Sequence, residues 1–260
     1  MYTMSSILIY SVFFAIGCIF GSFIMSLVWR IYTKQFSCTT RSVCTNCAVR
    51  ISWYHNIPIM SFLLLRGACH MCKKPISSYY IMTEIVAGLL LVLLALVHTV
   101  PLVGVTIVFV RDVIILFFLL FVFIYDARYM QIITGATIIP AMVLFLASLY
   151  FGWHAWQSMV LAALVGGGFF LIQYLISKGK WIGGGDIRLG VFMGVILGWP
   201  NILCALFLAY ISGALIGVLC IILRKKQLAS EIAFGTYLAA ATAVTLFWGE
   251  QIIQWYISLL

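Results

Sequence analysis

Two sets of side chains in this 260-residue sequence could do chemistry: acidic residues placed among apolar runs, and cysteines arranged in pairs. Only six residues are acidic, so the position of each one is informative. They are Glu84, Asp112, Asp126, Asp186, Glu231 and Glu250. Asp126 closes one long apolar run and Asp186 opens another. Because a carboxyl in or beside a membrane span is costly, it marks a pathway or a reaction centre by default.

Asp126 and Asp186 together are suited to peptide-bond hydrolysis. That reaction needs one carboxylate to deprotonate water and one protonated carboxyl to donate to the carbonyl oxygen, and two adjacent carboxyls that share a proton provide both. We therefore predict that these aspartates form a catalytic pair. The three residues before Asp186 have no side chains, so a substrate strand could approach their backbone closely. This candidate substrate loop consists of Gly183, Gly184 and Gly185.

Each acid also has a simpler explanation. Asp186 could be an ordinary N-cap after its glycines, and Asp126 could pair with nearby Arg128 at the end of a span. Glu84 stands where an apolar span begins, which favours a helix-start acid that interacts with the helix dipole over a role in a site. The presence of both aspartates in one membrane core favours the functional interpretation for that pair.

The cysteine pairs lie in the most polar part of the chain. Cys44-x2-Cys47 is followed, after twenty-one residues, by Cys69-x2-Cys72. This spacing is typical of tetrahedral zinc sites with four thiolate ligands. We predict a structural zinc ion, because no coordination position stays open and metal binding would stabilise a loop too short to build an adequate core. Two disulfides are the alternative, which a reducing compartment would disfavour.

The elements that must position these residues are membrane helices. Hydrophobic residues make up 65% of the chain and charged residues only 8%, against about 25% charged residues in soluble domains. Apolar runs recur eight times, and in lipid each must satisfy its own backbone hydrogen bonds as a helix does. The runs are Ile7 to Val28, Ile85 to Val97, Val113 to Tyr125, Ile132 to Phe151, Gln157 to Ile176, Ile187 to Trp199, Ile202 to Leu223 and Ile232 to Trp248. We predict an all-α polytopic membrane protein with about eight transmembrane helices and a small cytosolic zinc-binding loop subdomain.

The basic residues predict the orientation. Of the fifteen lysines and arginines, all except Arg111 fall on one side of the predicted topology. By the positive-inside rule that side is the cytoplasm, so the cysteine loop and both aspartates face it and both termini lie outside. The net charge of +9 therefore reflects topology. The predicted partner is a lipid bilayer and not a nucleic acid.

The predicted spans divide the chain into three parts. Residues 1–29 form the first transmembrane span, residues 30–80 the cytosolic four-cysteine loop, and residues 81–260 a membrane-embedded aspartyl peptidase domain. Arg111 and Asp112 resist this scheme, because they interrupt an apolar run from Val103 to Tyr125. Either the run before them is a re-entrant or interfacial segment, or the pair sits in the outer leaflet with the arginine reaching outward.

Several motifs resemble those of the type IV prepilin leader peptidases, members of the GxGD class of intramembrane aspartyl proteases. Gly183 to Asp186 is similar to the second catalytic motif, and Asp126 falls where the first catalytic aspartate is expected. The other similar segments are Gly21-Ser22-Phe23 with Arg30, Trp53 to Pro58, Leu65-Arg66-Gly67 leading into Cys69 and Cys72, and Ile76-Ser77 with Tyr80 and Glu84. The resemblance therefore covers most of the chain.

The resemblance implies an enzyme of the bacterial inner (plasma) membrane. Such an enzyme cleaves a short basic leader from prepilins or pseudopilins at the cytoplasmic face, typically after a glycine. Many members then methylate the new amino terminus with S-adenosylmethionine, which would be a second cofactor beside structural zinc. Substrates of this family belong to type IV pili, competence systems and type II protein secretion, and all of them would suit the same active site.

The chain departs from the family pattern at four places. Met25 replaces the asparagine usual after the opening motif, and Ile133-Thr134 replaces the usual Pro-Asp after the first aspartate. Tyr79 to Ile81 stands for Arg-Tyr-Pro, and Ala233 to Thr236 stands for Pro-Phe-Gly-Pro. Because the aspartate pair is unchanged, the peptidase expectation is unaffected. The family associates methylation with the cytosolic region and its flanks, so methylation is the activity that these departures would affect.

Two other functions fit parts of the sequence. Tyr125-Asp126 with the later glycine motif also matches presenilin-like and signal-peptide-peptidase-like proteases. Their Pro-Ala-Leu motif follows the glycine motif, however, whereas Pro140-Ala141-Met142 precedes it here, and they leave the cysteine loop unexplained. An ion-coupled transporter could use the two aspartates to relay protons, but the paired repeats common in transporters are not visible.

Overall fold

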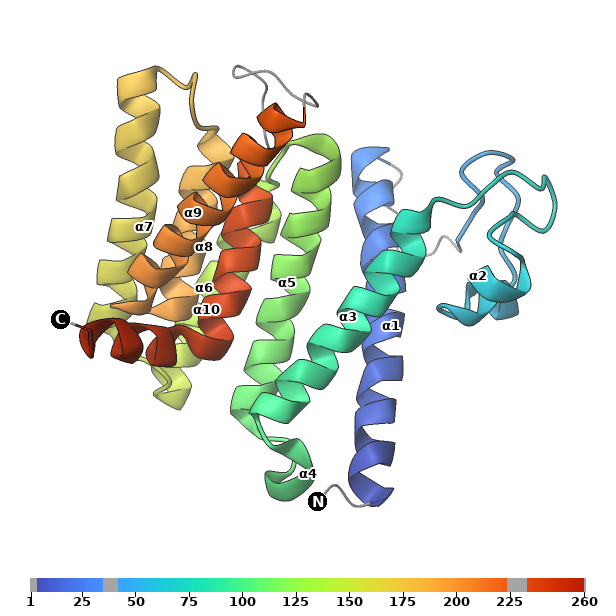
Figure 1. Cartoon of the computed structure of the whole chain (residues 1–260), viewed down its shortest axis with the longest axis horizontal. Helices are drawn as coiled ribbons and strands as arrows, with labels where there is room; N and C mark the ends of the chain where they lie inside the picture. Colours follow the sequence, from blue (N-terminus) through green and yellow to red (C-terminus); the bar gives the residue numbers. More distant parts are fainter. Residues whose placement is uncertain (1–3, 35–41, 224–232, 260) are drawn as a thin grey trace. The chain divides into compact units, whose positions relative to one another are not determined.

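The computed structural model describes residues 4–34, 42–223 and 233–259, and these residues form helices and loops without a named strand (Figure 1). The elements are α1 (Met4–Tyr32), η1 (Trp53–Asn56), α2 (Met60–Leu64), α3 (Ser78–Val97), α4 (Val100–Val103), α5 (Ile107–Tyr129), η2 (Thr134–Ala136), α6 (Ile138–Phe151), α7 (Trp156–Ser177), α8 (Gly184–Leu197), α9 (Asn201–Ile222) and α10 (Phe234–Ile257). Glu231 and Ile232 lie outside the described residues, as do four of the basic residues used to predict the orientation. These four are Arg41, Arg224, Lys225 and Lys226.

The helices fall into two compact units, residues 1–117 and residues 118–260, and α5 contributes to both. The first unit contains the cysteine loop, and the second contains both predicted catalytic aspartates. Each unit is described by itself. The division into residues 1–29, 30–80 and 81–260 stays a prediction.

The predicted all-helical polytopic membrane class is confirmed. Six helices among the described residues are long and apolar enough to cross a membrane. They are Ser6–Tyr32, Ser78–Val97, Ile107–Tyr129, Thr134–Phe151, Trp156–Ser177 and Asn201–Ile222. The expected count of about eight is not reached on length and composition. One predicted span corresponds to α8, whose 14 residues rise only about 21 Å, less than the roughly 30 Å of a bilayer core.

In the first unit, α1 and α3 pack with their backbones in close contact. A Cβ atom at Gly17 would lie 2.6 Å from the carbonyl oxygen of Ala87, and one at Gly21 would lie 2.8 Å from that of Thr83. Glycines spaced four residues apart let two membrane helices approach in this way, because no side chain separates them. The loop between α1 and α3 therefore starts and ends at one end of a tightly packed helix pair.

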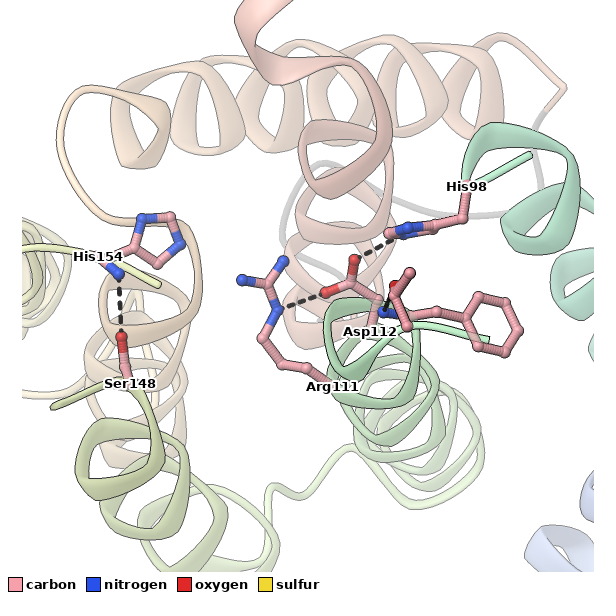
Figure 2. A network of polar contacts seen from close by, with 7 residues as sticks. His98, Arg111, Asp112, Ser148 and His154 are labelled. Atoms are coloured by element: carbon pink, nitrogen blue, oxygen red, sulfur yellow. Dashed lines mark hydrogen bonds and ion pairs between the residues drawn. The ribbon is translucent and has the colours of Figure 1, made fainter. Parts of the chain in front are cut away.

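The same unit settles where Arg111 and Asp112 lie. Both stand in the second turn of α5, inside a candidate span, and the separate short helix α4 occupies the preceding segment. Figure 2 shows the carboxylate of Asp112 between His98 and Arg111, with His98 Nε2 at 2.9 Å from Oδ2 and Arg111 Nε at 2.7 Å from Oδ1. Asp112 is buried, so this pairing offsets the desolvation of its charge.

In the second unit, the short helix α8 lies in the interior. It packs against α6, α7, α9 and α10, and Leu189, Phe192 and Met193 have no exposed surface. The contact with α7 is between backbones: a Cβ at Gly190 would lie 2.6 Å from the carbonyl oxygen of Gly166. A helix enclosed by other helices does not need to match the thickness of the bilayer. That enclosure explains how so short a helix can belong to a membrane core.

This packing predicts opposite effects for two glycine-to-alanine changes. A Cβ at Gly194 on α8 would overlap the backbone of Ala162, whereas a Cβ at Gly168 on α7 would meet no atom within 4 Å. We expect Gly194→Ala to destabilise the protein by about 1–3 kcal/mol through overpacking. Gly168→Ala should leave the stability unchanged or raise it by up to about 1 kcal/mol, because alanine favours the helix. Thermal unfolding in detergent measures both, and equal melting temperatures would contradict the backbone contact.

Candidate active site

Asp126 lies in the last turn of α5, and its side chain points to the start of α10. It is 4% exposed, and its Oδ2 accepts a hydrogen bond of 2.9 Å from the backbone N–H of Thr236. The backbone of Gly235 also hydrogen-bonds the carboxyl. Both donors belong to the first turn of α10, where unpaired N–H groups and the helix dipole favour a negative charge. Asp126 is therefore held by the start of α10, a contact that its position in the sequence did not indicate.

Sequence reasoning missed the role of this first turn. Ala233 to Thr236 counted only as a departure from a family motif, yet two of its residues contact the carboxyl of Asp126. A Cβ at Gly235 would lie 2.9 Å from Asp126 Oδ2, so only glycine lets the backbone come this close. Thr236 stands where the family pattern has proline, which has no N–H to donate. The one signal in the sequence was that residues 233–236 occupy the place of a family motif, which could have marked them as part of the site.

Asp186 is the third residue of α8, and the glycines before it form the start of that helix. Gly183 is the N-cap, and its N–H donates a hydrogen bond of 3.1 Å to Asp186 Oδ2. Asp186 is 8% exposed. The alternative that Asp186 is itself the N-cap is therefore wrong: Gly183 has that position, and Asp186, at the third helical position, reaches back to its N–H as half of a capping box. Its carboxyl is nevertheless buried in the interior of the unit.

The two carboxyls are held at two helix starts, Asp126 by the first turn of α10 and Asp186 by the N-cap of α8. Ile132 packs against both of the helix starts that hold these carboxyls, and so brings the two starts close to each other. A Cβ at Gly185 would lie 2.8 Å from Ile132 Cβ, and a Cβ at Gly235 would lie 2.9 Å from Ile132 Cδ1. Because both glycines lack a side chain, Ile132 can fill the space between them. The structure thus brings the two predicted aspartates, from α5 and α8, to one place.

The three predicted loop glycines differ in their surroundings. Gly183 is exposed, and a Cβ there would meet nothing closer than Asp186 Oδ2 at 3.7 Å. At Gly184 the nearest atom would be a guanidinium nitrogen of Arg188 at 3.8 Å, and Arg188 itself donates a hydrogen bond to Thr134. Gly185, by contrast, is already in contact with Ile132. Space for another chain beside the glycine backbone is therefore found at Gly183 and Gly184.

The second candidate site is the cysteine loop, where the two Cys-x2-Cys segments have the same fold. Cys44 N–H bonds to the carbonyl of Val49 at 2.9 Å, and Cys69 N–H bonds to that of Lys74 at 2.9 Å. Each second cysteine is followed by a residue in the left-handed region, with φ of 55° at Ala48 and 57° at Lys73. That conformation is uncommon outside glycine and persists where the surrounding structure fixes it. The two segments are matching knuckles that turn their sulfurs inward.

The sulfur atoms of Cys44, Cys47, Cys69 and Cys72 all lie within 4.8 Å of one another. The distance between the sulfurs of Cys44 and Cys72 is 3.9 Å, and all four cysteines are free thiols. Four thiolates around zinc at bonds of about 2.3 Å would lie about 3.8 Å apart. The donor set and its spacing therefore fit a tetrahedral zinc ion, and the disulfide alternative is not formed.

The thiols of the first knuckle influence one another. Desolvation raises the pKa of the Cys44 thiol, but hydrogen bonds from the backbone of Cys47 and Asn46 and from neighbouring thiols outweigh it and lower the pKa to about 6. For Cys47, a hydrogen bond from the backbone of Val49 lowers the pKa, whereas desolvation and the three other thiols raise it to about 11. The thiolate is the form that binds metal, so Cys44 offers a ligating sulfur near neutral pH, whereas Cys47 must lose its proton when metal binds.

Glu84 lies in the first unit and contacts the start of α2 in the cysteine loop. It stands in the second turn of α3, is 6% exposed, and its Oε2 accepts a hydrogen bond of 2.7 Å from the backbone N–H of Ile59, the N-cap of α2. Ile59 has φ of 61°, a genuine outlier for a β-branched residue. Glu84 therefore fastens the cysteine loop to α3, a contact that sequence reasoning did not foresee.

Comparison with known proteins gave matches along most of the chain. Residues 15–98 match the bacterial peptidase A24 N-terminal domain, and residues 113–218 match the type IV leader peptidase family. A prepilin leader peptidase/N-methyltransferase of Pseudomonas putida is 30% identical over 220 residues, covering 83% of this chain and 74% of its own length. Proteins with the same description from Aeromonas salmonicida and Bacillus subtilis are 29% and 28% identical, over 96% of this chain and 94% and 98% of their own lengths. No solved structure matches the chain significantly.

Proposed function

Because the chain belongs to the type IV leader peptidase family, we propose that it removes leader peptides from type IV prepilins or pseudopilins with Asp126 and Asp186 as an aspartyl pair. The observation that supports the pair most directly is that two buried carboxyls, from α5 and α8, are held at two helix starts that pack against the same side chain, Ile132. Family membership favours this function over a different GxGD protease and over an ion-coupled transporter.

The proposed reaction follows from a shared proton. Two interacting carboxyls do not both ionise easily, so one is the carboxylate and the other the acid. The carboxylate takes a proton from water, the resulting hydroxide attacks the carbonyl carbon of the scissile peptide, and the acid protonates the carbonyl oxygen. Collapse of the tetrahedral species breaks the C–N bond, and the leaving amine takes a proton from the pair. Backbone N–H groups of Thr236 and Gly183 hold the carboxyls in place throughout.

The proposed substrate approach uses the start of α8. An extended leader would lie along Gly183 and Gly184, where the backbone has no side chain in the way; Gly185 contributes by packing against Ile132. The proposed location is the bacterial inner membrane, with the cysteine loop and the aspartate pair toward the cytoplasm, since fourteen of fifteen basic residues fall on that side of the predicted topology.

We extend the proposal to N-methylation of the new amino terminus with S-adenosylmethionine, because the relatives carry both activities in their name. Purified protein should be incubated with a prepilin-like substrate, with and without S-adenosylmethionine, and the products weighed by mass spectrometry. We expect loss of the leader in both reactions and a further gain of about 14 Da, one CH2 group, only with the methyl donor. Leader loss without the mass gain would reject methylation alone, and failure to cleave several such substrates would reject the peptidase.

A further inference from the structure

The cysteine loop exposes apolar side chains and has no interior of its own. No residue between 42 and 82, all of which the structure describes, is buried. Met60, Leu63 and Leu64 lie on α2 at the spacing that shares one helix face, and Leu64 is 76% exposed. Trp53, on the adjoining helix η1, is 80% exposed. We call Trp53, Met60, Leu63 and Leu64 the apolar face. Such a face on a polar loop marks an interaction surface.

The position of the apolar face along the axis of α3 indicates which partner it can contact. The hydrogen bond from Ile59 N–H to Glu84 fixes the start of α2 beside the second turn of α3. Glu84 is six residues after Ser78, where the candidate span begins, which is about 9 Å along the helix axis. Figure 1 shows α2 accordingly alongside the α1–α3 pair and not beyond its end. The apolar face therefore lies at the level where the span enters the bilayer.

The positive charge of the cysteine loop indicates what kind of surface the apolar face binds. Four basic residues of the loop, Arg50, Arg66, Lys73 and Lys74, are exposed, and Arg66 follows α2 within two residues. No acidic residue occurs before Glu84, which is buried against Ile59. A surface that combines aromatic and aliphatic residues with lysine and arginine matches anionic lipid headgroups and the adjoining acyl chains. A basic leader peptide, the occupant that the proposed function would supply, is repelled by the same charges.

We propose that the apolar face of the cysteine loop inserts into the cytoplasmic leaflet as an interfacial anchor, with the basic residues around it binding anionic headgroups. Trp53 and the α2 side chains would lie about 5–10 Å into the headgroup and acyl boundary. The contact between Glu84 and Ile59 sets the depth, and η1 and α2 pack against each other. The cytoplasmic side is taken from the proposed orientation; the docking itself does not depend on peptidase activity.

The test places a fluorescent amino acid at Leu64 of the full-length protein and, in a matched control, at Asn46, an exposed residue of the first knuckle. Each protein is reconstituted in bilayer discs that contain phosphatidylglycerol or only phosphatidylcholine. In phosphatidylglycerol discs we expect the Leu64 label to be quenched by doxyl-labelled lipids and to resist acrylamide in water, and the Asn46 label to behave in the opposite way. Equal acrylamide quenching at both positions, without lipid quenching, would overturn the proposal.

Charge variants and peptide addition complete the test. Arg66→Gln, Lys73→Gln and Lys74→Gln together should lower lipid quenching at Leu64 in phosphatidylglycerol discs to the level found in phosphatidylcholine. Unchanged quenching would reject the headgroup contact. A Leu64 label that acrylamide reaches in both discs, and that only a leader peptide protects, would assign the face to the substrate and overturn the proposal. Unchanged metal content and thiol reactivity of each variant show that the loop is still folded.

Discussion

Asp126→Asn and Asp186→Asn are each expected to lower the rate of leader cleavage by at least about 10²-fold, the lower range for loss of a general acid or base. Asparagine has the shape of aspartate but neither ionises nor carries a transferable proton. The carbonyl oxygen of the asparagine amide at 126 can still accept from Thr236, so the site should keep its geometry. Cleavage of a prepilin-like substrate by each purified variant, followed by mass spectrometry, measures the effect.

The chain supplies a matched control on the same helix. Asp112 is also a buried aspartate of α5, but it pairs with His98 and Arg111, so Asp112→Asn should keep cleavage per folded molecule near that of the unchanged protein. Asp126→Glu tests the fixed geometry: its extra methylene pushes the carboxyl beyond its present position, against the first turn of α10, and we expect inactivity. Cleavage near the normal rate in Asp126→Asn or Asp186→Asn would refute the aspartyl pair, and full activity in the glutamate variant would refute the demand for exact placement.

Zinc removal is expected to unfold the cysteine loop before it affects the aspartate site. The purified protein should contain about one zinc per chain, held by four thiolates. Structural zinc sites stabilise small domains by roughly 10–16 kcal/mol at neutral pH, and residues 42–82 contain no buried side chain that could replace this contribution. Cys44→Ser or a strong chelator should therefore make the loop susceptible to trypsin, whose targets Arg50, Arg66 and Lys73 are exposed there.

Cys220→Ser is the matched control, because Cys220 is a free thiol on α9, in the other unit from the cysteine loop. Metal content, tryptic cleavage and thermal stability should be the same in this variant as in the unchanged protein. Protein that contains no zinc while all four loop thiols react freely, yet keeps a trypsin-resistant loop, would rule out the metal site. An equal loss of zinc in both cysteine variants would rule out the assignment of its ligands.

Local spacing in the sequence was sufficient for some parts of the structure. Two Cys-x2-Cys pairs predict converging sulfurs because each pair forms its own turn, and the sulfurs of Cys44 and Cys72 lie 3.9 Å apart. The apolar runs likewise predict membrane helices, since a span satisfies its hydrogen bonds within itself. The closeness of Asp126 and Asp186 was also predictable, because both stand at helix ends that the predicted topology places on one side.

Contacts between distant segments were not predictable from such patterns. Nothing local in Gly235 and Thr236 indicates that their backbone would hold a carboxyl 110 residues earlier in the chain. The bond between Glu84 and Ile59 depends on how the loop folds back along α3. The number of spans was not predictable for a related reason. A helix of 14 residues such as α8 is too short to cross a bilayer but can be enclosed by other helices. Only the tertiary packing shows which of these two positions the helix has.

The position of Ile132 between Gly185 and Gly235 has a consequence for the evolution of this chain. One side chain fills the space beside both glycines, so the three positions cannot vary independently. A larger residue at Gly185 would collide with Ile132 unless position 132 became smaller in the same lineage, and one at Gly235 would collide with the carboxylate of Asp126 as well. A smaller residue at 132 alone would leave a void between the two helix starts. Substitutions here should therefore be strongly non-additive. We therefore expect Gly185, Gly235 and Ile132 to change together in evolution and not one at a time.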